Sequence, residues 1–144
     1  RATVRGIHPE ILSEQGLAAA LADVAATAAV PVRIVCPNPL PAMPEGVLAS
    51  GYFFACEAIA NVAKHAPDAS VTVLLAADSH LRVSVVDNGP GGARFTDGHG
   101  LAGMRERLAA FGGELTISSP PGGPTQVLAV VPLLLNRGEP AVKL

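Results

Sequence analysis

The sequence contains few cysteines, few aromatic residues and little net charge. Among its 144 residues are 2 cysteines, no tryptophan and 3% aromatic residues, and the formal net charge is -2. Cys36 and Cys56 form no CxxC pair, which favours ordinary buried thiols in a reducing compartment over a structural disulfide. Without an excess of lysine and arginine the chain lacks the electrostatic footprint of a nucleic-acid-binding protein, so we expect no nucleic-acid partner.

Long hydrophobic runs are also missing. Asp23 and Pro132 interrupt apolar stretches, so no segment approaches the roughly 20 residues that a helix needs to span a bilayer. The sequence begins at Arg1 with neither a methionine nor a charged-then-apolar leader. We therefore expect a soluble, cytoplasmic piece of a longer protein, and that longer protein can itself carry a membrane anchor.

Apolar periodicity and the positions of proline predict one domain with two layers. The length of 144 residues suffices for a single hydrophobic core. Helices are expected over residues 11–29, 45–66 and 101–111, and strands over residues 32–35, 71–75, 81–86, 114–118 and 126–131. The strand at 32–35 lies between prolines, which is typical of a sheet edge. The order of elements favours an α+β fold, a two-layer sandwich with a mixed, mostly antiparallel sheet and helices on one face.

A polar stripe runs along the long predicted helix. Asn61 follows Glu57 by four residues, and Lys64 and His65 follow Asn61 by three and four, so their side chains share one face. One interpretation is a solvated helix face. The other is a surface for phosphate and a metal ion, since an amide oxygen can bind magnesium, a lysine can neutralise phosphate and a carboxylate can accept a proton.

A turn rich in glycine follows the strand expected at 81–86. Asp87 begins it, and Gly89 and Gly91 lie within it, so a ligand can approach the backbone closely. The Asp87 carboxylate can accept a hydrogen bond from an exocyclic amine such as that of adenine. Taken alone, this short pattern is weak evidence for a ligand site, and an ordinary Asn-Gly or Gly-Gly turn explains it more often.

A second glycine-rich segment, Gly98 to Met104, stands at the start of the last predicted helix. Free backbone N–H groups and the positive end of a helix dipole favour an anion at this place. The alternative is a flexible helix start. No Gly-Lys-Ser/Thr follows and no strand leads directly into the segment, so it is neither a Walker loop nor a dinucleotide fingerprint.

Together, in this order, the three elements resemble the Bergerat-type ATPases, the group of gyrase, Hsp-type chaperones, mismatch-repair ATPases and histidine kinases. The string EAIANVAKHA at Glu57–Ala66 looks like the asparagine box of nitrate-sensor-type histidine kinases, and GLAGMRER at Gly100–Arg107 looks like their second glycine box. The opening at Arg5–Leu12 is similar to the junction between their dimerisation helices and catalytic domain. The resemblance extends over nearly the whole chain up to Pro132.

The resemblance implies roles for individual residues. Asn61 would bind magnesium, Glu57 would help to activate the attacking imidazole, and Lys64 and His65 would lie near the phosphates of ATP. Asp87 would bind adenine, with Gly89 and Gly91 beside it. Thr125 would assist adenine binding through its hydroxyl, although Pro124 replaces its usual glycine neighbour. The residues implied for the lid and the phosphates are Gly98, Gly100, Leu101, Gly103 and Met104.

The resemblance also implies how the domain works. Residues 1–135 would form an ATP-binding catalytic domain, with 1–12 as the junction from missing dimerisation helices and 136–144 as a tail. With ATP and magnesium, it would transfer the γ-phosphoryl group to a histidine on a separate dimerisation domain of the same protein, and from there to an aspartate of a response regulator. None of the four histidines has the acidic follower of the family's acceptor, so we expect the acceptor elsewhere and the isolated domain to be monomeric.

Two alternatives stay open. One is a serine kinase acting on an anti-sigma antagonist, although the Lys64-His65 pair fits the histidine kinase branch better. The other is a nucleotide-binding sensory or scaffold module that never transfers phosphate. Phosphoserine on a partner would favour the first, and no phosphohistidine in the presence of a cognate helical domain would favour the second.

Overall fold

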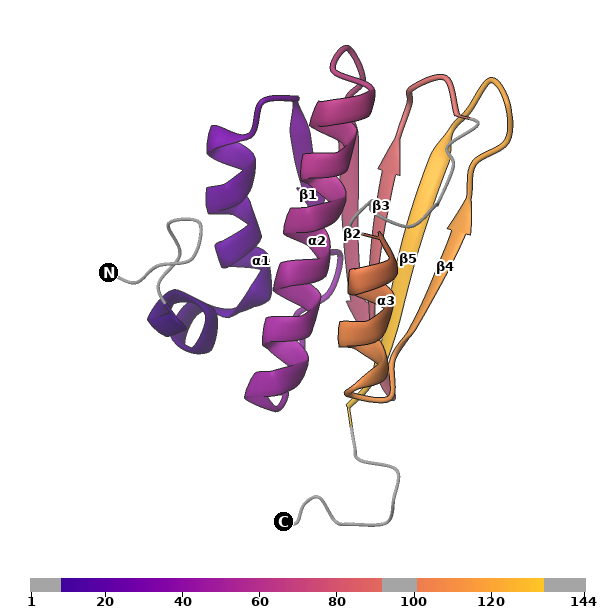
Figure 1. The fold of residues 1–144 in the computed structure, drawn as a ribbon. Helices are drawn as coiled ribbons and strands as arrows, with labels where there is room; N and C mark the ends of the chain where they lie inside the picture. Colours follow the sequence, from indigo (N-terminus) through magenta and orange to yellow (C-terminus); the bar gives the residue numbers. More distant parts are fainter. Residues whose placement is uncertain (1–8, 92–100, 134–144) are drawn as a thin grey trace.

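The computed structural model describes residues 9–91 and 101–133. Within these residues three helices lie against one face of a five-stranded sheet (Figure 1), which confirms the predicted two-layer α+β sandwich. In chain order the elements are α1 (Pro9–Thr27), β1 (Val32–Val35), α2 (Glu45–His65), β2 (Val71–Ala77), β3 (His80–Asp87), α3 (Leu101–Ala109), β4 (Glu114–Ser118) and β5 (Thr125–Pro132).

The sheet is mostly antiparallel, as predicted. Its strand order is β1-β2-β3-β5-β4, with β1 parallel to β2 and the other neighbours antiparallel. The short β1 is an edge strand, in agreement with its flanking prolines. Burial alternates along β5 from Thr125 onward, because successive side chains of a strand face opposite sides. One side of the sheet is therefore covered by helices, and we call it the helix-covered face.

The core lies between this face and the helices. Leu17 and Leu21 anchor α1, and Met104 and Leu108 anchor α3, all with at most 1% of their surface exposed. Burying one such side chain contributes about 1.5–3 kcal/mol. These contacts fix the positions of α1 and α3 on either side of α2, which lies between them (Figure 1).

The first and last helices have other boundaries than the sequence predicts. The predicted helix at 11–29 begins at Pro9, ends at Thr27 and is broken at Gly16, whose φ of 91° no regular helix contains. The last helix ends at Ala109 rather than at residue 111. Just after this end, the N–H groups of Phe111 and Gly113 donate to the Leu108 carbonyl at 2.9 and 2.7 Å. That tight turn satisfies carbonyl oxygens at the helix end, which periodicity alone does not reveal.

The expectation that no segment approaches membrane-spanning length is wrong for α2. Glu45–His65 contains 21 residues, and an 18-residue window within it has a mean hydropathy of 1.3, so by length and composition it is the one such helix within the described ranges. Half of its apolar window is buried within the fold. The core helix of a soluble protein meets the same criterion, so this composition is weak evidence for a membrane span.

Candidate functional site

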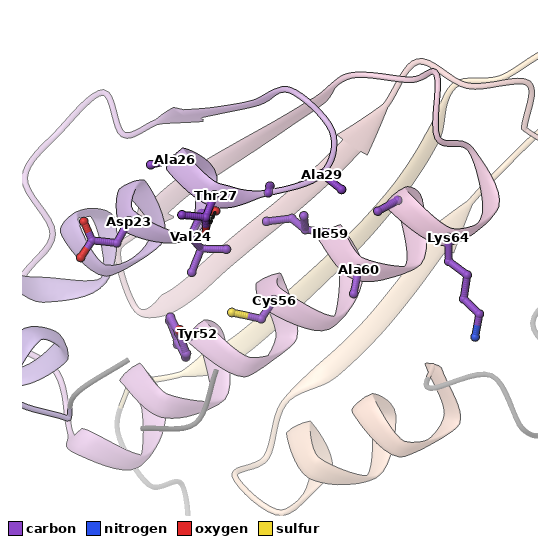
Figure 2. A pocket seen from close by; sticks show the side chains of 12 residues that line it. Asp23, Val24, Ala26, Thr27, Ala29, Tyr52, Cys56, Ile59, Ala60 and Lys64 are labelled. Carbon is purple, nitrogen blue, oxygen red and sulfur yellow. Dashed lines mark hydrogen bonds between the residues drawn. The ribbon is translucent and has the colours of Figure 1, made fainter. Parts of the chain in front are cut away.

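The polar stripe of α2 has a partly buried half and an exposed half. Glu57 and Asn61 are partly buried, whereas Lys64 and His65, in the last turn, are exposed. The opposite side of the helix carries the buried Ile59. Figure 2 shows the Lys64 side chain extending away from α1. On a fully solvated helix face, a carboxylate and an amide would both be exposed. The partial burial of Glu57 and Asn61 therefore fits a ligand-binding surface better than a solvated helix face.

Asp87 is a buried carboxylate at the end of β3. It lies opposite Val71 of β2 and Thr125 of β5, with 7% of its surface exposed. Its Oδ1 accepts a hydrogen bond from the Gly89 N–H at 2.9 Å, and within residues 9–91 and 101–133 its other oxygen accepts none. This second oxygen is not among the fully buried side-chain atoms that lack a partner, so a donor that arrives from solvent can reach it. The arrangement is therefore suited to a ligand that brings an N–H or O–H group.

Asn88 fastens the turn after Asp87 to the start of β2. Its Oδ1 accepts from the Ser70 N–H at 2.8 Å, and its Nδ2 donates to Ser70 Oγ at 3.1 Å. The Asn88 N–H also donates to the Ser70 carbonyl at 3.2 Å. Three hydrogen bonds between two residues hold the turn in one place relative to the sheet, so the Asp87 carboxylate keeps a defined position.

The same turn lies backbone to backbone against the β4–β5 turn. The Gly122 N–H donates to the Pro90 carbonyl at 2.7 Å. Gly91 has a φ of +70°, and a Cβ atom added there would collide with the Pro120 carbonyl oxygen and lie 2.5 Å from the Gly123 nitrogen. Glycine is therefore required at position 91 both for its backbone conformation and for space.

Thr125 completes this end of the sheet. It is 9% exposed and stands directly opposite Asp87, and its Oγ1 lies 2.6 Å from Ser119 Oγ. The sequence predicts Asp87 and Thr125, and the structure brings them together. It does not predict Ser119, because the hydroxyl pair forms only when β4 and β5 close around their turn.

The residues expected at the lid are placed in part. Gly98 and Gly100 lie outside the described residues. Leu101 begins α3, and Gly103 is partly buried on it with open space where a Cβ would stand. Met104, 1% exposed, lies in the core and lines an apolar cavity of about 280 Å³ between α2 and α3. Met104 thus holds α3 against α2 by packing.

A larger cavity of about 860 Å³ lies between α1 and α2 (Figure 2). Its lining is mostly apolar, with Asp23 and Lys64 as its charged members. Of the predicted site residues only Lys64 lines it. The polar groups that need a ligand do not converge there, so this cavity is separate from the Asp87 site.

No group of three or more His, Cys, Asp or Glu side chains capable of holding a metal ion occurs in the described part of the chain. A metal ion at Asn61 would therefore need most of its oxygen ligands from water and from a bound phosphate compound. Magnesium binds in this way at many phosphate-transfer sites, with few protein ligands and several other oxygens.

Comparison of the amino-acid sequence with known proteins finds a matching family. Residues 54–135 match the family described as histidine kinase-, DNA gyrase B-, and HSP90-like ATPase. Sensor histidine kinase MctS of Rhizobium johnstonii is 32% identical over 142 residues, which cover 91% of this chain and 31% of that protein. Nitrate/nitrite sensor protein NarQ of Escherichia coli is 42% identical over 76 residues, 49% of this chain and 13% of that protein. The chain thus spans less than a third of either relative.

Solved structures confirm the fold. The Erythrobacter litoralis EL346 blue-light activated histidine kinase superposes with a TM-score of 0.68 at 22% identity, over 81% of this chain and 42% of that one. At this level of identity the similarity shows that the two chains share an architecture.

Proposed function

Because this chain belongs to the family of histidine kinase-, DNA gyrase B-, and HSP90-like ATPases, and its relatives are sensor histidine kinases, we propose that it serves as the catalytic domain of a two-component kinase. The chain is an ATP-binding domain of the histidine kinase kind. In the proposed reaction the γ-phosphoryl group of ATP passes to a histidine on a separate dimerisation domain, and then to an aspartate of a response regulator.

The observation that carries the proposal is the state of Asp87. Its carboxylate is buried, one oxygen is engaged by the Gly89 N–H, and the other accepts no hydrogen bond from described residues. Adenine offers an exocyclic amine that would satisfy that oxygen. Gly91 lets the turn after Asp87 pack closely against the β4–β5 turn, and Thr125 adds a hydroxyl on the neighbouring strand.

The polar stripe of α2 would handle the phosphates. Lys64 and His65 are exposed in the last turn, where a flexible cation can follow a triphosphate. Backbone N–H groups at Gly98, Gly100, Leu101 and Gly103 would meet phosphate at the start of α3, since helix N-termini favour anions, and the buried Met104 would keep that helix in place.

Asn61 fits a magnesium ligand because its amide oxygen is a hard donor on a partly buried position. Bound there, magnesium would neutralise charge on the transferred phosphoryl group. Glu57 lies one helical turn before Asn61 and would accept the proton of the attacking imidazole, the role of a general base. The contribution of the chain is thus to position the reactants and to move one proton.

We extend the proposal to the whole protein on the similarity to NarQ and on the sequence strings described above. The kinase would be of the nitrate-sensor type, with residues 1–135 as its catalytic domain, 1–12 as the junction to the dimerisation helices and 136–144 as a tail. The isolated domain would be monomeric and would lie on the cytoplasmic side of any membrane anchor.

A phosphotransfer assay tests the proposal. The chain is mixed with labelled ATP, magnesium and the helical dimerisation domain of its own full-length protein. We expect acid-labile, alkali-stable phosphohistidine on the helical domain. Glu57→Gln should slow its formation at least about 100-fold, because general-base contributions are of that size, whereas Glu114→Gln, on the exposed side of β4, should not.

Other outcomes of this assay identify the alternatives. Acid-stable phosphoserine on a partner would indicate a serine kinase of the anti-sigma type. Nucleotide binding with no phosphohistidine would indicate a sensory or scaffold module and contradict the catalytic part of the proposal.

A further inference from the structure

We propose that Ser119 is a positioning residue for adenine recognition, acting through the hydroxyl of Thr125. The inference rests on the proposed nucleotide site and adds a residue to it that no sequence pattern indicates. Ser119 touches no ligand in this account. It holds Thr125 in the orientation that adenine binding requires.

The first support is the contact itself. Ser119 Oγ and Thr125 Oγ1 are 2.6 Å apart, a short distance for an O–H···O hydrogen bond. Thr125 is 9% exposed and Ser119 is partly buried, so water competes weakly for the pair. A hydrogen bond in such a place selects one of the staggered side-chain rotamers of threonine.

The second support is where Thr125 stands. Thr125 and Asp87 are paired residues of antiparallel β5 and β3, and both side chains are buried on the helix-covered face. Directly opposed residues of this kind have Cβ atoms about 4.5–5.5 Å apart. The orientation of the Thr125 hydroxyl therefore determines which polar atoms stand beside the Asp87 carboxylate.

The third support is the turn between the two hydroxyl residues. Ser119 precedes Pro120, and Thr125 follows the turn that Gly122 fastens to the Pro90 carbonyl. The hydroxyl pair closes the base of this turn while Gly122 holds its tip. Ser119 is therefore the residue that links the position of the turn to the position of Thr125.

The test is nucleotide selectivity of the 144-residue chain, measured by calorimetric titration of MgATP and MgGTP. Ser119→Ala should weaken MgATP binding about 3- to 10-fold, the range expected for one net hydrogen bond. Binding of MgGTP, which lacks the adenine amine, should change less, so the preference for adenine falls. Ser118→Ala removes an exposed neighbouring hydroxyl and should leave both affinities unchanged.

Two further comparisons separate positioning from general stability. Ser119→Thr retains a hydroxyl and should keep the adenine preference that Ser119→Ala loses. Ser119→Val has the shape of the threonine variant but no hydroxyl, and it should lose the preference. In a Thr125→Val background, Ser119→Ala should have no further effect, because contacting residues that act together are not additive.

The outcomes distinguish this inference from the proposed function. Parent binding of MgATP with unchanged selectivity in Ser119→Ala, or equal loss for both nucleotides, overturns the role of Ser119 alone. Full additivity of the Ser119 and Thr125 effects also overturns it. Failure of the parent chain to bind MgATP overturns the proposed site and this inference with it.

Discussion

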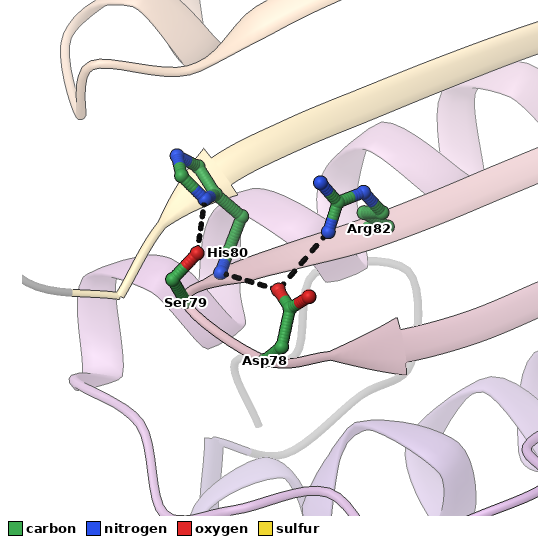
Figure 3. Close-up of polar contacts among 4 residues, drawn as sticks. All are labelled: Asp78, Ser79, His80 and Arg82. Carbon is green, nitrogen blue, oxygen red and sulfur yellow. Dashed lines mark hydrogen bonds and ion pairs between the residues drawn. The ribbon is translucent and has the colours of Figure 1, made fainter.

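Asp78 and Asp87 stand at opposite ends of β3, and their surroundings differ. Asp78 precedes the strand in the β2–β3 turn, with 71% of its side chain exposed (Figure 3). Its Oδ1 accepts from the His80 N–H at 3.1 Å and from an Arg82 guanidinium nitrogen at 3.0 Å. The His80 backbone hydrogen bond, with the Arg82 hydrogen bond and charge, lowers the pKa of Asp78 below its ordinary value.

The partners of Asp78 all come from its own hairpin, and solvent reaches the carboxylate. Asp87 is buried, and one of its oxygens accepts no hydrogen bond from the described residues. When neighbouring residues already donate hydrogen bonds to an exposed carboxylate, that carboxylate contributes only a little to the stability of its turn. A buried carboxylate with unused capacity is a place for a ligand. The comparison therefore distinguishes an aspartate that its own hairpin satisfies from one that we propose to bind a ligand.

The largest expected effect is on ATP affinity in Asp87→Asn. Asparagine keeps the shape and one oxygen but places an N–H₂ group near the adenine amine, so a donor faces a donor. We expect MgATP binding to weaken about 100-fold, which corresponds to about 2.7 kcal/mol. Calorimetric titration measures it, with thermal unfolding as a check on folding.

Asp78→Asn is the matched control for that experiment. It makes the same chemical change in the turn that precedes the other end of β3 and should leave MgATP affinity unaltered. Equal affinities for Asp87→Asn and the parent chain would remove the distinction between the two carboxylates.

The second effect is on stability, at the contact between the Asp87 turn and the β4–β5 turn. Gly91→Ala combines an unfavourable positive φ with a collision against the backbone of Pro120. We expect a loss of about 2 kcal/mol in the free energy of unfolding, measured with urea.

Gly122→Ala separates the two causes. Its φ is +89°, yet nothing lies within 4 Å of an added Cβ. We expect a loss of about 1 kcal/mol from backbone conformation alone. If Gly91→Ala and Gly122→Ala lower the free energy of unfolding equally, the collision with Pro120 does not contribute to the loss at position 91.

A third, smaller effect concerns Asn88, which ties the Asp87 turn to Ser70. Asn88→Ala removes two side-chain hydrogen bonds at an exposed position where water can replace them. We expect about 1 kcal/mol lower stability and weaker MgATP binding, since Asp87 loses its fixed position. Amide hydrogen exchange at Ser70 should become faster, and unchanged exchange would contradict the anchoring role.

The smallest effect is the pH dependence of Asp78. The pKa of Asp78 is lower in the folded state than its ordinary value of 3.8. Its carboxylate therefore stabilises the fold above pH 3.8, and this stabilisation is lost as the pH falls through the pKa of the folded state. The unfolding midpoint of the parent should slightly exceed that of Asp78→Asn at pH 7. The difference should vanish in acid and shrink at high salt. A difference that grows in acid would contradict the lowered pKa.

The sequence predicts the elements of this fold better than their contacts. Alternating apolar residues and flanking prolines locate β1 and β4 correctly, because these signals are local. The break at Gly16 is not predicted, since glycine permits a positive φ without requiring it. Likewise the apolar content of α2 is underestimated when only uninterrupted runs are considered.

The sequence likewise predicts the residues of the proposed site better than the contacts between them. Asp87 and Thr125 are recognisable from their motifs, and the structure adds that they are paired across two strands. Ser119 has no motif, because its contact with Thr125 forms only when the turn between β4 and β5 closes. The fit of Gly91 against Pro120 is a contact between two distant loops, and such contacts follow from tertiary packing.

The most direct test of the nucleotide site is calorimetric titration of ATP into the parent chain and Asn61→Ala, with and without magnesium. We predict one ATP per parent chain, bound more tightly with magnesium, and an Asn61→Ala chain that retains adenine binding but loses the magnesium effect. No heat of binding in the parent under either condition would contradict the account.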